Sequence, residues 1–211
     1  MKRSTVVGFV TALALSASPL LFVTSASAQS SNEPLSNNCE TSTLPPHTGF
    51  QIAPACVSTH HGEVTTQEKN PSLLIVEAPA TVKSGETFTI RVSTRNLVRD
   101  RFLAAGAGGY YKEMGILNGD GLTRGHFHTA CRLIGNGKAA LSPDRQFDTF
   151  VATEDGAGGA TPDVVTVNIR GIKGRGEAQC ASWAGDGSHR MPMMQFANQI
   201  PAFDAVRIKV N

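Results

Sequence analysis

The chain is short of charge, and after residue 28 it has no apolar run long enough to cross a membrane. Asp, Glu, Lys and Arg make up 17% of its 211 residues. Without Lys2 and Arg3 the 19 basic residues become 17, which equals the 17 acidic residues. A chain with no excess of positive charge lacks the electrostatic footprint of a nucleic-acid binder, so that class of partner is excluded. A membrane span is not expected either.

The chain also lacks the motifs of common enzymes. It has no Gly-x-Ser-x-Gly nucleophile motif and no C-x-x-C pair that would indicate a metal-thiolate site. No recognisable pair of carboxylates suggests glycoside cleavage. The sequence therefore contains no complete catalytic set, and it favours a protein without enzymatic activity.

The N-terminus has the layout of a secretory signal peptide over residues 1–28. Lys2 and Arg3 precede an apolar run, and Ala26-Ser27-Ala28 forms a small-x-small cleavage site before Gln29. The alternative is a membrane anchor, but the run is interrupted by polar residues and by Pro19. We therefore expect a secreted protein, extracellular or periplasmic. An even number of cysteines in such a protein predicts two disulfides, formed by Cys39, Cys56, Cys131 and Cys180.

Residues 29–70 and residues 71–211 differ in pattern. The first segment is rich in Ser, Thr, Asn and Pro and has little apolar periodicity, which predicts an extended, partly disordered arm. A Cys39–Cys56 bridge would close a loop in this arm. The second segment has the length of one domain.

Residues 71–211 show the two-residue period of β-strands. Phe88, Ile90 and Val92 alternate with polar residues, and the same alternation recurs over residues 165–169 and 206–210. Residues 110–117 lead into Asn118-Gly119-Asp120-Gly121, a hairpin turn signal before the next strand. No long segment has a helical period. The pattern predicts an all-β domain, an antiparallel immunoglobulin-like β-sandwich, with loops at residues 106–109 and 156–159.

The order of several short motifs in this domain resembles a known family. The motifs are the strand Thr87–Val92 ending before Asn96-Leu97, then Tyr110-Tyr111, Gly125-His126-Phe127-His128, Ser188-His189, Met191-Pro192, and a last strand Asp204–Val210. The chain resembles a family of small secreted proteins, mostly fungal with bacterial relatives, that carry a Gly-His-x-His motif. The resemblance implies export and an arm followed by a sandwich domain. It implies no established activity.

The chain departs from the family pattern in its cysteines. The family has a cysteine in the last strand where this chain has Ala205, and an aliphatic residue where this chain has Cys131. The resemblance therefore implies that a Cys131–Cys180 bridge replaces the family's link to the last strand. Such a bridge would join the histidine strand to a strand near Trp183.

His126 and His128 form half of a candidate metal site. Side chains two apart on a strand share one face, so both imidazoles lie opposite the apolar face formed by Phe127 and Cys131, and they point toward solvent or a cleft. His189 follows a glycine-containing loop that is able to fold back over the sheet. Three imidazoles with an open position suit copper or zinc, and a thioether from Met191 would favour Cu(I).

Less specific interpretations compete with this one. The three histidines can be unconnected surface residues. His60 and His61 lie in the arm, where adjacent residues on a mobile chain make a poor site, so we expect them to be solvated. We expect Met191, Met193 and Met194 to fill gaps in the core. Tyr110, Tyr111 and Trp183 could form a sugar-stacking platform, but we expect most of the 13 aromatic residues of the chain to pack into the core instead.

Two functional hypotheses follow. The first is an extracellular module that binds copper or zinc through His126, His128 and His189. The alternative is a structural or adhesive module without metal, with a partner at the cell surface or in the matrix. A metal-dependent enzyme is a third and weaker possibility.

Overall fold

The computed structural model describes residues 39–143 and 146–211. The predicted signal peptide over residues 1–28 lies outside the described residues. Within the described part there is no α-helix, only the 3-10 helices η1 (Cys39–Thr41), η2 (Gln67–Lys69) and η3 (Ala105–Ala107). None of these helices has the length and apolarity that crossing a membrane would require.

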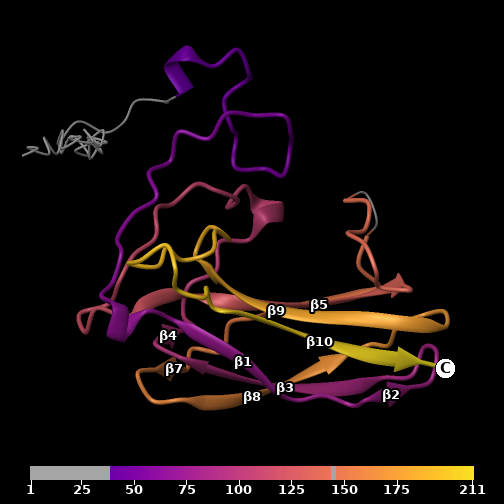
Figure 1. Ribbon diagram of the computed structural model, residues 1–211. Helices are drawn as coiled ribbons and strands as arrows, with labels where there is room; N and C mark the ends of the chain where they lie inside the picture. The colour runs from indigo at the N-terminus through magenta and orange to yellow at the C-terminus, as the bar shows by residue number, and fades with distance from the viewer. Residues whose placement is uncertain (1–38, 144–145) are drawn as a thin grey trace, which may run out of the picture. The chain divides into compact units, whose positions relative to one another are not determined.

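The described residues of the domain contain ten strands. They are β1 (Ser72–Glu77), β2 (Thr81–Val82), β3 (Phe88–Arg95), β4 (Leu97–Val98), β5 (Thr123–Gly135), β6 (Thr149–Thr153), β7 (Gly158–Gly159), β8 (Asp163–Ile169), β9 (Gly176–Asp186) and β10 (Phe203–Val210). One sheet has the order β1-β3-β8, and the other has the order β2-β10-β9-β5-β4-β7 with β6 paired to β5. Figure 1 shows the main strands of the two sheets as two layers.

The predicted all-β sandwich is confirmed. Most neighbouring strands are antiparallel, as expected, but the short pairs β2–β10 and β4–β5 are parallel. The second glycine-rich stretch, predicted as a loop, contributes β7, whose two glycines pair with β4. An immunoglobulin-like topology stays a prediction.

The core lies between the sheets and is built by the two-residue period of the strands. On β3, Phe88, Ile90 and Val92 are buried while their neighbours are exposed. They share one hydrophobic core with Phe127 of β5 and Ile208 of β10. Alternation places the other face of β5, which carries His126 and His128, on the outside of the sandwich.

Both disulfides form. Cys39 is bonded to Cys56 within the arm, at a sequence separation of 17. Cys131 is bonded to Cys180, at a separation of 49, and the two residues lie directly opposite each other on β5 and β9. This second bridge lies in the core on the strand that carries Trp183, as the resemblance implied.

The described part of the arm is extended but not loose. The Gly49 carbonyl accepts from the Tyr110 N–H, and the Thr59 hydroxyl donates to the Tyr111 carbonyl. Further along, Gly62 pairs with Gly115 in a parallel bridge. Residues 39–70 of the predicted arm are therefore ordered by contacts with the domain, and residues 29–38 of the predicted arm lie outside the described residues. Polar composition gave no sign of these contacts because backbone groups make most of them.

Residues 110–117, which precede the predicted hairpin turn, do not form a strand. The turn at Asn118 is present, with its side-chain oxygen accepting from the Asp120 and Leu122 N–H groups, but only Leu117 bridges to Thr123 across it. The segment pairs with the arm instead, so β5 takes β9 and β6 as its antiparallel neighbours.

A buried arginine fixes the chain just after β4. Arg99 is 1% exposed and makes ion pairs with Asp155 and Asp163. Hydrogen bonds from its guanidinium hold the pKa of Asp163 below its usual range against the opposing effect of burial. This anchor positions residues 101–103, which cross over the histidine face of β5.

Candidate metal centre

Strand β5 places His126 and His128 side by side. The strand is thirteen residues long and pairs with β9 on one side and β6 on the other. These pairings fix the stretch of backbone that carries the two histidines. His126 is 0% exposed and His128 is 6% exposed. The predicted face is correct, since both point away from the sandwich core. Of the two expected surroundings, solvent or a cleft, the structure has the cleft: residues 101–103 cover the outer face, and His128 lines a pocket there.

His189 comes from the turn that follows β9. The Asp186 carboxylate accepts from the Ser188 and Arg190 N–H groups and pairs with the Arg190 guanidinium. The His189 N–H donates to the Asp186 carbonyl, and His189 itself has a left-handed φ of 70°. This turn folds the chain back, as its glycines allowed, and directs the imidazole over β5.

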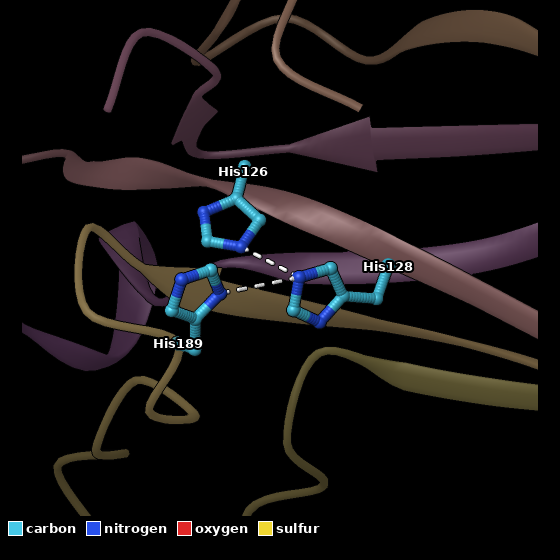
Figure 2. A group of neighbouring side chains, drawn as sticks. All are labelled: His126, His128 and His189. Atoms are coloured by element: carbon cyan, nitrogen blue, oxygen red, sulfur yellow. Dashed lines mark hydrogen bonds between the residues drawn. The ribbon is translucent and has the colours of Figure 1, made fainter. Parts of the chain in front are cut away.

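The three imidazoles converge. Figure 2 shows the rings pointing toward one another, two from β5 and one from the turn after β9. His126 Nε2 lies 2.8 Å from His128 Nε2, and His189 Nδ1 lies 3.4 Å from the same atom. One ring nitrogen from each residue lies within 4.8 Å of the others. The interpretation of three unconnected surface histidines is therefore wrong.

Two backbone carbonyls orient the cluster. His126 Nδ1 lies 3.1 Å from the Arg101 carbonyl oxygen, and His189 Nε2 lies 2.6 Å from the Leu103 carbonyl oxygen. A carbonyl only accepts, so these two ring nitrogens carry the protons. In the neutral rings, His126 Nε2 and His189 Nδ1 then present lone pairs to the centre of the cluster. Metal-bound histidines are oriented in the same way by acceptors on their other nitrogen.

Two of the three nitrogen–nitrogen separations are close to those around one small ion. Two ligands at about 2.0–2.1 Å from a tetrahedral metal lie roughly 3.3 Å apart. The observed 2.8 Å and 3.4 Å lie on either side of that value. The donor set contains three imidazoles, which suits zinc or copper better than magnesium or calcium.

Aromatic side chains enclose the histidines. The ring of Phe102 packs edge-on against those of His126 and His189, with centroids 4.8 Å and 5.1 Å away.

Burial lowers the pKa of His126 to about 4, although the Arg101 carbonyl opposes the shift. Burial and then the neighbouring histidines lower the pKa of His128 to about 3. Both rings are therefore neutral, as metal ligands must be, well below the ordinary histidine pKa.

These pKa shifts predict how the stability of the metal-free protein depends on pH. Unfolded histidines bind protons below about pH 6.5, whereas the folded protein keeps His126 and His128 neutral down to about 4 and 3. The unfolded state therefore binds more protons in this window, and stability falls as the pH falls. At about 1.4 kcal/mol per pKa unit, the loss should reach several kcal/mol by pH 4. Urea denaturation of the apo-protein between pH 4 and 7.5 measures it.

A pair of asparagine variants separates this effect from carboxylate titration. His128→Asn should reduce the slope of unfolding free energy against pH between 4 and 6.5. His61→Asn changes an exposed histidine of the arm and should leave the slope unaltered. Equal slopes in wild type and His128→Asn would show that the buried ring does not control acid stability.

Gly185 makes room for His126 and provides a second prediction. The two residues are paired across β9 and β5, and a Cβ at Gly185 would lie 3.2 Å from both Cε1 and Nε2 of the ring. The ring is held by a carbonyl and Phe102, so it has little space to yield. Gly185→Ala should therefore weaken metal affinity about tenfold, as loss of ligand orientation does elsewhere. Isothermal titration with Zn(II) measures the change.

Gly119 supplies the matched control. A Cβ at this position meets no atom within 4 Å, and its φ is not in the left-handed region. Gly119→Ala should bind Zn(II) like the wild type. If Gly185→Ala also does so, the fit between this glycine and the imidazole has no bearing on the site.

A pocket of about 450 Å³ opens beside the cluster. His128 and His189 line it, together with the aromatic residues Phe102, Tyr110, Phe150 and Trp183.

Tyr110 stacks on Tyr111 and donates its hydroxyl hydrogen to the Tyr111 oxygen at 2.6 Å. Burial, together with this bond, raises the pKa of Tyr110, which keeps the phenol neutral. The expectation that most aromatic residues pack into the core is wrong: Phe88 and Phe127 belong to the core cluster, whereas Tyr110, Tyr111 and Trp183 are only partly buried.

The other candidate ligands lie elsewhere. His60 and His61 are exposed, as expected. Met191 and Met193 are 40% and 43% exposed, so the expectation that they fill the core is wrong. Met191 lines a different pocket, with His61 and Glu63, and does not line the pocket of the cluster. A role for this methionine as a fourth ligand therefore has no support.

Sequence patterns missed the residues that cover the site. Phe102 and the two carbonyls at residues 101 and 103 come from a segment with no periodicity, and Phe150 lies on a short strand. Carbonyl acceptors carry no sequence signal because every residue has one. Only the fold identifies which of them face an imidazole.

Scans against protein-family models and curated protein sequences return no match for this chain. The resemblance drawn from the order of its motifs therefore stays a prediction, and the site must be interpreted from its geometry.

Proposed function

We propose that this protein is exported and binds one copper or zinc ion through His126, His128 and His189. The observation that carries the proposal is the convergence of three ring nitrogens within 4.8 Å, with two of the rings held by backbone carbonyls. A cluster of this kind has the right donor atoms and the orienting acceptors of a metal centre.

The proposed ion would have an open coordination position. The cluster supplies three protein ligands, and two of them line a pocket of about 450 Å³. Structural zinc sites are closed by four protein ligands, whereas sites that exchange or activate a ligand keep a position free. This favours an ion that meets a small molecule over one that only stabilises the fold.

Export is supported by the cysteines and by the N-terminal sequence. Both disulfides belong to the described residues, which contain no free cysteine. Disulfides of this kind persist in oxidising compartments such as the extracellular space or the periplasm. The signal-like sequence before Gln29 agrees with such a destination.

Metal analysis of protein purified without a His-tag tests the proposal. We expect about one ion of copper or zinc per chain, and titration of the apo-protein with Cu(II) or Zn(II) should show a single site. Electron paramagnetic resonance of the Cu(II) form should show nitrogen ligands. Absence of binding to the apo-protein would overturn the proposal, and the metal-free adhesive module would become the better account.

A further inference from the structure

The pocket beside His128 and His189 combines aromatic side chains with imidazoles. Its aromatic residues surround the two histidines that reach it, and no Asp, Glu, Lys or Arg lines it. We propose that the pocket binds an aromatic ligand carrying an anionic oxygen donor, a carboxylate or phenolate, at the open position of the metal. This inference rests on the proposed function.

The need for an anion follows from charge. Three neutral imidazoles leave a divalent ion with its full charge, and the groups that orient two of the rings are uncharged carbonyls. The nearby carboxylates are already engaged: Glu113 is paired with Arg101, and Asp186 with Arg190. An uncompensated charge in a buried site is unfavourable, so an anionic oxygen from the ligand would be strongly preferred.

The aromatic part of the ligand follows from the shape and chemistry of the walls. Phe150 and Trp183 lie against the ring of His128, with centroids 4.9 Å and 5.3 Å away, and Tyr110 lies 5.9 Å from that of His189. A donor bound at the metal would have its remaining atoms directed among these rings. A flat ring buries apolar surface there and stacks favourably on its neighbours. The volume of about 450 Å³ is within the range of small-molecule sites.

Benzoate and acetate test the proposal because they share the same donor group. We expect benzoate to bind the Co(II)-loaded protein at least about tenfold more tightly than acetate, because only benzoate carries a ring to bury. The visible spectrum of Co(II) reports binding of either anion to the ion. Acetate binding alone shows that the position is open.

Two phenylalanine variants test the role of the wall. Phe150 and Phe196 are 42% and 47% exposed, and only Phe150 lines the pocket. Phe150→Ala should lower the ratio of benzoate to acetate affinity about fivefold to tenfold, the share that an aromatic contact provides. Phe196→Ala should keep the wild-type ratio.

The outcomes separate this inference from the function on which it rests. If Co(II), Zn(II) and Cu(II) all fail to bind, both proposals fall. If a metal binds but benzoate binds no more tightly than acetate, or Phe150→Ala keeps the wild-type ratio, only the ligand proposal falls.

Discussion

Replacing any one of His126, His128 and His189 with alanine should lower the affinity for Cu(II) or Zn(II) by at least about 100-fold. Loss of a group that only orients a ligand already costs about 10-fold to 100-fold, so loss of a ligand itself should cost more. His128 Nε2 lies 2.8 Å from His126 Nε2 and 3.4 Å from His189 Nδ1, so its removal takes away the donor that contacts both other imidazoles. Competition against a chromophoric chelator measures each affinity.

His61→Ala is the control for this series. It removes an exposed imidazole that takes no part in the cluster, so affinity should stay at the wild-type value. Because His126 is fully buried, circular dichroism of each apo-variant must confirm that the fold is kept. His189 is only half-buried, so His189→Ala should disturb the fold least of the three substitutions. If the variant that lacks all three imidazoles binds metal like the wild type, the histidine cluster is not the metal site.

Loss of the Cys131–Cys180 bridge should destabilise the protein more than loss of the Cys39–Cys56 bridge. The two bridges span 49 and 17 residues. Closure of such loops corresponds to roughly 4 and 3 kcal/mol in the chain-entropy model. Cys131 and Cys180 are also 0% exposed in the core, so their replacement removes packed atoms in addition. Denaturant unfolding of the two paired Cys→Ala variants measures the difference.

The variant that lacks the Cys131–Cys180 bridge also tests whether this disulfide contributes to metal binding. Cys131 lies on the core face of β5, opposite the imidazoles, so its loss should lower stability without removing a ligand. Zinc affinity of the folded Cys131→Ala/Cys180→Ala protein should therefore stay within a few-fold of wild type. Equal stability of the two paired variants would show that loop length and burial do not govern these bridges.

Local sequence pattern was sufficient for the class of fold. Alternation at Phe88, Ile90 and Val92 predicted a half-buried strand because strand side chains point to opposite faces in turn. The same rule placed His126 and His128 together on the face opposite Phe127. The turn signal at residues 118–121 did not predict the partner of residues 110–117, because the choice between pairing with β5 and pairing with the arm depends on segments far apart in the sequence.

The sequence by itself determined that the two histidines of β5 share a face, since two-residue spacing on a strand leaves no other arrangement. Only the tertiary structure decided that this face is buried and that His189 completes the cluster. The segment before residue 104 is held by Arg99 and supplies two carbonyls to the imidazoles. The turn at Asp186 brings His189 across 61 residues of chain to within 3.4 Å of His128. Such contacts depend on how distant segments pack, which no local periodicity encodes.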